Sequence, residues 1–277
     1  MEAITYQQLL EAGVHFGHLR RKWCPRMAPY IFMERKGIHI IDLNKTLECL
    51  NEAAAALKQV SRSGKNILFV ATKKQAKQIV REAAQRAGMP YVTERWLGGM
   101  LTNFATIRKS IKKLQNIENM LDENAQVSIT KKERLRLSRE KAKMEKVLSG
   151  VASLNRLPAA VYIVDIMHEN IALAEARRLG ILTVAMVDTN SDPTLVDFPI
   201  PANDDATKSI SIITNYLADA VIEGVAERQQ DREEVEGVEE AESATVLSSL
   251  DLGDEETPRH GERRKSGRRT SGRGIKG

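Results

Sequence analysis

Two uninterrupted apolar runs, each followed by a helix of amphipathic pattern, constrain the fold of this chain more than any other feature. Residues 66–71 and 159–165 are almost wholly apolar, which is typical of strands that are covered on both faces. Further helical and strand patterns alternate after these runs: residues 73–87, 91–93, 168–179 and 181–187. Because neighbouring parallel strands need a crossover connection, this order predicts an α/β fold with a parallel sheet between two layers of helices.

The residues before the first apolar run predict a helix, a β-hairpin and a second helix. A short helix is expected at 5–12, and two apolar stretches at 30–33 and 38–42 flank a polar turn that ends in glycine. An alanine-rich helix is expected over 43–61, and Gly64 follows it as a typical C-terminal cap.

Residues 104–150 interrupt the alternation and form an insertion. Apolar residues at helical spacing mark a first helix: Ile107, Ile111, Leu114, Ile117 and Leu121. Thr130 and Glu133 carry the spacing of a capping box and therefore predict the start of a second helix. We expect an antiparallel, coiled-coil-like α-helical hairpin that projects from the sheet domain and has a polar linker at 122–129.

The chain therefore divides into four segments. Residues 1–103 are the N-terminal segment and first half of a three-layer, Rossmann/flavodoxin-like parallel-sheet domain, and residues 104–150 are the helical hairpin. Residues 151–226 are the second half of that domain, and residues 227–277 are a tail. A closing helix is expected over 204–228, so it crosses the boundary into the tail by two residues. The tail is rich in Glu, Ser, Gly and Arg and has no aromatic residue, a composition that predicts disorder.

The charge is distributed unevenly along the 277 residues. Residues 227–256 hold 12 acidic and 2 basic residues, and residues 257–277 hold 8 basic and 1 acidic. The total of +5 therefore leaves +8 for residues 1–226. A folded domain that is basic in its own right indicates a polyanionic partner.

Several protein classes are excluded or disfavoured by what the chain lacks. No apolar run approaches the length of a membrane span, and the N-terminus has no basic segment leading into an apolar one, so no secretory signal is expected. Two cysteines, Cys24 and Cys49, make no disulfide framework, and a reducing cytoplasm is expected. The turn after the first buried strand lacks the G-x-G-x-x-G pattern of a dinucleotide loop, and neither a P-loop nor a G-x-S-x-G elbow occurs in the chain. His15, His18 and Cys24 lack a fourth zinc ligand.

The run Arg95-Trp96-Leu97-Gly98-Gly99-Met100-Leu101-Thr102-Asn103 is the strongest candidate for a binding loop. An exposed Trp96 beside Arg95 would offer a stacking face and a phosphate partner, and the glycine pair would let the backbone approach a ligand closely. The alternative is a buried tryptophan followed by a tight turn.

Two further groups of residues carry candidate chemistry. Lys73 and Lys74 follow the first buried strand, where a helix N-terminus capped by Thr72 would bind phosphate; the alternative is a solvated first turn. Acidic residues lie in the loops after the predicted strands: Asp165, Asp188, Asp192, Asp204 and Asp205. They either cap helices and turns or hold a structural Mg²⁺ through oxygen ligands, with Asp188, Asp204 and Asp205 as the candidate set.

Five segments together resemble one known family. They are Leu9-Leu10-Glu11-Ala12-Gly13-Val14-His15-Phe16-Gly17-His18; Ile38-His39-Ile40-Ile41-Asp42-Leu43; the Arg95–Asn103 run; Val187-Asp188-Thr189-Asn190-Ser191-Asp192-Pro193; and Ile200-Pro201-Ala202-Asn203-Asp204-Asp205-Ala206. In this order they resemble the family of bacterial small-subunit ribosomal protein number two, over about residues 1–226. The chain departs from the family at Cys24, where asparagine is expected, and in its long basic tail over 259–276.

The resemblance implies a three-layer α/β domain with a helical hairpin, a cytoplasmic location in the ribosome, and no catalysis. It also implies binding to small-subunit ribosomal RNA near the head–body junction and contacts with neighbouring ribosomal proteins, including number one. No cofactor, membrane, DNA or homo-oligomer is expected. The basic tail is expected to add RNA affinity by counterion release, and the acidic block before it to restrain that binding.

We expect the RNA contacts to be mostly electrostatic, with little reading of base edges. The candidate RNA-binding residues lie in the N-terminal segment, the turn after Thr72, the Trp96 loop and the hairpin: His15, His18, Arg20, Arg21, Lys22, Lys73, Lys74, Arg95, Trp96, Gly98, Gly99, Asn103, Arg108, Lys109, Lys112 and Lys113.

Two other function classes share the predicted fold. An α/β enzyme acting on a nucleotide or a phosphorylated metabolite would need a glycine-rich cofactor loop, which is missing, and has no use for a basic helical arm. A free-standing RNA chaperone would act away from ribosomes.

Overall fold

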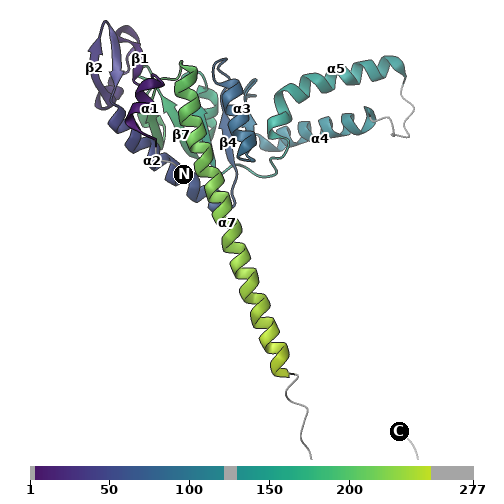
Figure 1. The fold of residues 1–277 in the computed structure, drawn as a ribbon. Coiled ribbons are helices and arrows are strands. Elements are labelled where there is room, and N and C mark those ends of the chain that lie inside the picture. Colours follow the sequence, from purple (N-terminus) through teal and green to yellow (C-terminus); the bar gives the residue numbers. More distant parts are fainter. Residues whose placement is uncertain (1–3, 122–129, 251–277) are drawn as a thin grey trace, which may run out of the picture. The chain divides into compact units, whose positions relative to one another are not determined.

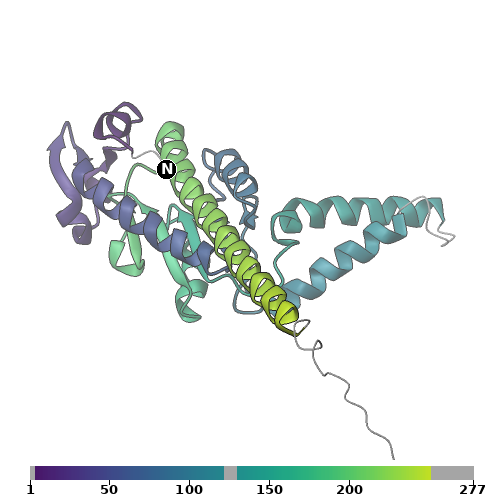
Figure 2. The same cartoon turned by 60° about the horizontal axis from the view of Figure 1, so that its bottom comes forward.

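The computed structural model describes residues 4–121 and 130–250, with side chains described as far as Glu233. Five parallel strands form the central sheet in the order β5-β4-β6-β7-β8 (Figures 1 and 2). The strands are β4 (Ile67–Val70), β5 (Tyr91–Val92), β6 (Ala160–Val164), β7 (Leu182–Val187) and β8 (Phe198–Pro201). Their register pairs Ile67 with Ala160 and Ala160 with Leu182. The predicted parallel α/β sheet is confirmed.

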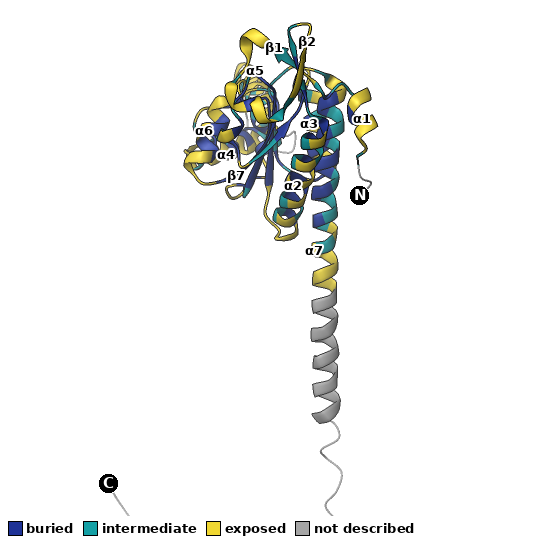
Figure 3. Ribbon diagram, turned by 90° about the vertical axis from the view of Figure 1, so that its left-hand side faces the viewer, coloured by how far each residue is buried: buried dark blue, intermediate teal, exposed yellow. Residues whose placement is uncertain are grey.

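Helices cover both faces of this sheet. They are α2 (Leu43–Arg62), α3 (Lys77–Arg86), α6 (Asn170–Arg178) and α7 (Thr207–Leu250). Alternate residues of each strand face opposite layers, as Phe69 packs in a core with α2, α3 and α7, and Leu68 packs in a second core with α6. Figure 3 shows the buried residues concentrated in the sheet and on the inward faces of its helices. The three-layer arrangement therefore follows from strands that are apolar on both sides.

The structure corrects several predicted boundaries. Strand β8 was not predicted because its sequence, Phe-Pro-Ile-Pro, carries two prolines; it lies at the sheet edge, where prolines are tolerated. Helix α3 begins at Lys77, later than the predicted residue 73, because residues 73–76 form a separate turn. Helix α7 continues to Leu250, past the predicted end near residue 228, through a segment rich in the helix former Glu. The disorder predicted for the tail, 227–277, stays a prediction, and residues 251–277 lie outside the described residues.

A smaller antiparallel sheet precedes the central one. Helix α1 (Tyr6–Glu11) begins at a Thr5 capping box and leads to strands β1 (Phe16–Leu19), β2 (Ile31–Arg35) and β3 (Ile38–Ile41), in the order β1-β3-β2. The predicted hairpin is confirmed as β2 and β3, and β1 is an addition. Gly17 allows β1 to lie against the loop after β7, since a Cβ at Gly17 would stand 2.5 Å from Thr189 Cγ2. This contact places the N-terminal segment at the carboxyl edge of the central sheet.

The predicted insertion is an antiparallel pair of helices, α4 (Phe104–Leu121) and α5 (Lys131–Leu148), which run side by side in Figures 1 and 2. The Thr130 side chain caps α5 by accepting from the backbone N–H of Glu133 at 3.3 Å. At the base of the hairpin, Ile107, Ile111 and Leu148 join the second core. The linker predicted at 122–129 lies outside the described residues.

Candidate nucleic-acid interface and polar cluster

Trp96 is a core residue, so the predicted exposed stacking face is wrong. Only 8% of Trp96 is exposed, and its indole Nε1–H donates to the Glu175 carboxylate at 3.1 Å. The following loop binds the same carboxylate through the backbone N–H groups of Gly99, Leu101 and Thr102 at 2.7 to 3.0 Å, and through the Thr102 hydroxyl. The loop is therefore shaped around one buried anion instead of an external phosphate.

Glu175 remains charged despite its burial. Burial by itself would raise the pKa of this carboxyl, but hydrogen bonds from Thr102, Gly99 and Trp96 outweigh it and lower the pKa below its ordinary value. A carboxylate that accepts several N–H bonds is strongly favoured in its ionised form. Sequence reasoning missed Glu175; the available signal was a glutamate on the inward side of the predicted helix 168–179, beside Ala172 and Ala176.

Within the Trp96 loop, the two glycines have different roles. Gly99 adopts φ +85°, a conformation that favours glycine, and its N–H is one of the donors to Glu175. Gly98 is exposed, and a Cβ added there would meet no atom within 4 Å. Arg95 and Asn103 are also exposed. Gly98, Arg95 and Asn103 therefore stay available to a partner, whereas Gly99 serves the loop itself.

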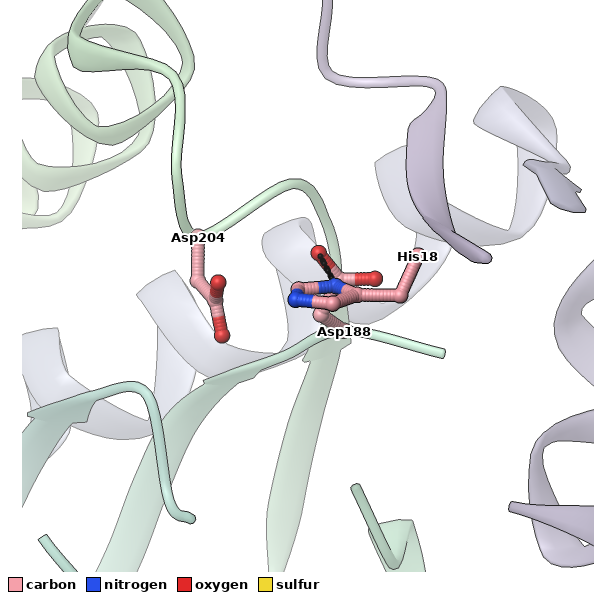
Figure 4. Close-up of side chains that lie close together, drawn as sticks. All are labelled: His18, Asp188 and Asp204. Atoms are coloured by element: carbon pink, nitrogen blue, oxygen red, sulfur yellow. Dashed lines mark ion pairs between the residues drawn. The ribbon is translucent and has the colours of Figure 1, made fainter. Parts of the chain in front are cut away.

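The carboxyl edge of the central sheet holds a compact cluster of one imidazole and two carboxylates (Figure 4). His18 extends from β1 toward Asp188, which follows β7, and Asp204, which follows β8. His18 Nδ1 lies 2.9 Å from Asp188 Oδ2, and a ligand atom from each of the three residues lies within 4.8 Å of the others. The hydrogen bond with Asp188 raises the pKa of His18, although burial opposes it. This convergence confirms that the acidic residues after neighbouring strands meet at one edge.

Lys73 closes this cluster from the side of β4. Its ammonium lies 2.7 Å from Asp204, 2.6 Å from Asp205 and 3.1 Å from Asp165. Burial would lower the pKa of Lys73, but its bonds to Asp204 and Asp205 raise the pKa instead. Lys73 is therefore occupied internally and is not the phosphate contact that the sequence predicted.

The turn that carries Lys73 is not the predicted phosphate-binding helix N-terminus. Thr72 does not cap a helix, because its N–H and hydroxyl both donate to the buried Glu169 carboxylate. Lys74, in contrast, is exposed and stays available for a backbone contact.

Asp204 has an unmet bonding requirement. It is completely buried, and its Oδ2 has no hydrogen-bond partner among the described residues. Burial, together with the nearby charges of Asp165 and Asp188, raises the pKa of Asp204 to about 7, against the opposing effect of Lys73. The third acid of the predicted cation set, Asp205, is half exposed and paired with Lys73. The three side chains close enough to share a cation are His18, Asp188 and Asp204.

The basic residues of the hairpin lie on its outside, as predicted. Arg108, Lys109 and Lys112 are exposed and form no ion pair with a described acidic side chain, whereas Lys113 pairs with Glu140. A groove of about 760 Å³ between the Trp96 loop and the base of the hairpin has apolar walls and a basic rim that includes Arg95 and Lys113. Arg139 and Lys143 on α5 belong to the same rim and were not predicted.

The N-terminal segment supplies a second basic surface. Arg20, Arg21 and Lys22 form the exposed 3-10 turn η1 (Arg20–Lys22) after β1. His15 is half-buried, and burial lowers its pKa, so it is a neutral side chain near pH 7. The unexpected Cys24 leaves the local backbone intact, because its N–H donates to the Thr189 carbonyl at 2.9 Å.

These features define a three-layer α/β protein with an inserted basic hairpin, whose sheet edge carries ion pairs in place of a glycine-rich cofactor loop. The family model for ribosomal protein S2 matches residues 9–224, and the chain belongs to that family. None of the helices in the described residues has the length and apolarity that a bilayer crossing needs.

Similar proteins from three organisms all carry the description small ribosomal subunit protein uS2. The one from Cytophaga hutchinsonii is 62% identical over 249 residues, which is 90% of this chain and 98% of the relative. The relative from Bacteroides thetaiotaomicron is 55% identical, covering 92% of this chain and 94% of its own length. The relative from Porphyromonas gingivalis is 55% identical over 84% and 83%. Membership in a family of ribosomal proteins confirms the resemblance, the predicted ribosomal location in the cytoplasm and the absence of enzymatic activity.

Proposed function

We propose that this chain is a structural component of the small ribosomal subunit that binds ribosomal RNA through two basic surfaces, near the head–body junction. One surface is the outer face of the hairpin, and the other is the N-terminal turn η1. The main support for the hairpin surface is that Arg108, Lys109 and Lys112 are exposed on α4 and have no acidic partners among the described residues. Exposed cations of this kind bind phosphates of any sequence and release counterions as they do so.

The test is the salt dependence of binding between the full-length protein and small-subunit ribosomal RNA. Replacing Arg108, Lys109 and Lys112 by glutamine should lower the slope of log affinity against log salt by about 2 to 3, since each lost phosphate contact removes about 0.7 to 0.9. A charge-matched control replaces Lys65, Arg177 and Arg178, which are exposed elsewhere, and should leave the slope unchanged. Equal slopes for both triple variants would refute the hairpin surface.

We also propose that ribosomal protein number one docks on the exposed apolar face of the N-terminal sheet. Tyr6, Phe16, Phe32 and Met33 are between 47% and 67% exposed and line a cavity of about 420 Å³ together with the β2–β3 strands. An apolar surface of this kind is uncommon unless a partner covers it. Phe32→Ala should weaken capture of protein number one by purified subunits, while RNA binding stays unchanged; the reverse pattern would contradict this assignment.

For the polar cluster, we propose a divalent cation held by His18, Asp188 and Asp204. The buried Asp204 Oδ2, which has no hydrogen-bond partner among the described residues, supports this, and the imidazole favours Zn²⁺ over the Mg²⁺ expected from carboxylates alone. Thermal unfolding with added Zn²⁺ or Mg²⁺ should show stabilisation of the wild type and none of Asp204→Asn. Stabilisation that is equal in both proteins would contradict the site.

The chain is proposed to act as a single copy within the subunit. Sedimentation of the purified protein should give a monomer, and a stable dimer at micromolar concentration would contradict this.

A further inference from the structure

The structure exposes a tryptophan that the sequence analysis did not single out. Trp23 directly follows η1 and is 38% exposed, in contrast to Trp96. Its indole packs against the ring of His39 in β3, with ring centroids 5.4 Å apart and an angle of 42° between the planes. A large flat side chain that is held by a neighbouring ring and still open to solvent is a preformed stacking surface.

His39 adds an independent indication that a ligand belongs next to Trp23. The residue is only 7% exposed, and neither of its ring nitrogens has a hydrogen-bond partner among the described residues. An imidazole carries at least one N–H at any pH, so a buried ring with both nitrogens unpartnered is costly unless another group supplies the partner.

Cations lie in η1, which directly precedes Trp23, and beside the turn that precedes β3 and His39. The backbone N–H of Arg20 donates to the Gly37 carbonyl at 3.0 Å, which places η1 beside the β2–β3 turn that carries Arg35 and Lys36. Together with Arg21 and Lys22, these side chains are all exposed. Arg20 forms the one ion pair in this group that the described residues show, with Glu34 at 3.4 Å. The surroundings of Trp23 therefore match a sugar–phosphate backbone.

We propose that Trp23 is the stacking platform for an unpaired nucleobase of ribosomal RNA, with the η1 cations on the adjoining phosphates. The inference rests on the proposed RNA-binding function and specifies the kind of RNA that this surface takes. It requires a single-stranded segment, because a base inside a duplex already has neighbours on both faces.

The experiment compares two short RNA strands of equal length, one with bases and one abasic throughout. Trp23→Ala in the full-length protein should weaken binding of the base-bearing strand about tenfold, the effect of losing one stacked base, and leave binding of the abasic strand unchanged. Trp23→Tyr should retain most of the affinity, because tyrosine also stacks. Leu179→Ala removes an apolar side chain of similar exposure, 41%, at the end of α6 and should have no effect on either strand.

Fluorescence gives a second readout that does not depend on replacing Trp23 by a small residue. The chain has two tryptophans, so the emission that Trp23→Phe removes from the wild-type signal belongs to Trp23. The base-bearing strand should quench that component, and the abasic strand should not. If Trp23→Ala binds the base-bearing strand as tightly as the wild type, or loses the same affinity for both strands, the stacking inference is overturned and the proposed function is not. A wild type that binds neither strand overturns the proposed function and this inference with it.

Discussion

Trp96 and Trp23 are the two tryptophans of this chain, and the structure uses them in opposite ways. Trp96 is buried, donates to Glu175 and belongs to the second core. Trp23 is 38% exposed, packs against His39, whose ring nitrogens have no hydrogen-bond partner among the described residues, and directly follows the basic turn η1. The pair shows that a tryptophan directly after a basic residue, Lys22 or Arg95, is ambiguous in sequence. The partner of its indole N–H and the charges around it separate a structural residue from a binding residue.

The largest expected effect separates the two tryptophans by stability. Trp96→Ala should destabilise the fold by about 3 to 5 kcal/mol, because it leaves a cavity in the core and removes a donor from Glu175. Trp23→Ala, at a position that is 38% exposed, should change the free energy of unfolding by only about 1 kcal/mol. Chemical denaturation of both variants measures the difference. Similar losses would mean that Trp23 is also a core residue.

A smaller loss is expected from the anion that organises the Trp96 loop. Glu175→Gln keeps the size of the side chain but presents an NH₂ group to backbone donors that need an acceptor. The variant should lose about 2 to 3 kcal/mol, the range for disrupting a buried charge-assisted network. Glu82→Gln on the exposed side of α3 is a matched control and should be near neutral. Denaturation midpoints compare the two, and an unaffected Glu175→Gln would show that the loop holds its shape without the charge.

The pH dependence of stability tests the same carboxylate without a change in shape. Because the folded state lowers the pKa of Glu175, its stabilising effect is complete above the ordinary glutamate pKa of 4.5 and is lost as the pH falls through the folded value. Wild-type stability should therefore fall more steeply than that of Glu175→Gln as the pH decreases below 4.5. Parallel curves for the two proteins would contradict the assigned shift.

The smallest effect distinguishes the two glycines of the loop. Gly99→Ala should cost about 1 kcal/mol, because alanine is strained at a positive φ and its Cβ would stand 3.2 Å from Asn103 Cβ. Gly98→Ala should leave stability within about 0.5 kcal/mol, since its surroundings are open. A thermal scan of each variant is sufficient. If Gly98→Ala weakened RNA binding without loss of stability, Gly98 would be a point of close backbone approach.

The sequence was sufficient for the elements whose signal is periodic. The sequence predicted strands β4, β6 and β7, helix α2 and the hairpin. A strand buried on both faces is a continuous apolar run, and an amphipathic helix repeats its apolar residues every three or four positions, so neighbouring residues are enough to recognise both. Strand β8 was missed because its prolines are acceptable only at an edge, and edge position is a property of the sheet order.

The candidate site was less predictable because pairing between distant residues decides it. Lys73 was expected to face phosphate, but Asp204, far along the chain, provides its counter-charge. Trp96 was misjudged for the same reason, as Glu175 lies on a different helix. The convergence of Asp188 and Asp204 was predicted, since parallel strands end at one edge, whereas the addition of His18 depends on how β1 docks against the loop after β7.

The position of the hairpin has a consequence for the order of folding. The central strand pair, β4 with β6, joins residues on either side of the whole insertion, so Ile67 meets Ala160 only after both hairpin helices have been synthesised. Bringing β4 and β6 together closes a long loop, which is slow. Once the hairpin has formed from local contacts, its two ends lie close together and the loop that remains to be closed is shorter. At its end, Gly150 fits closely against the Tyr91 backbone, leaving no room for a side chain, and this contact delivers β6 beside β4. We therefore expect the hairpin to fold early during synthesis, and β6 to pair with β4 only after the hairpin has formed.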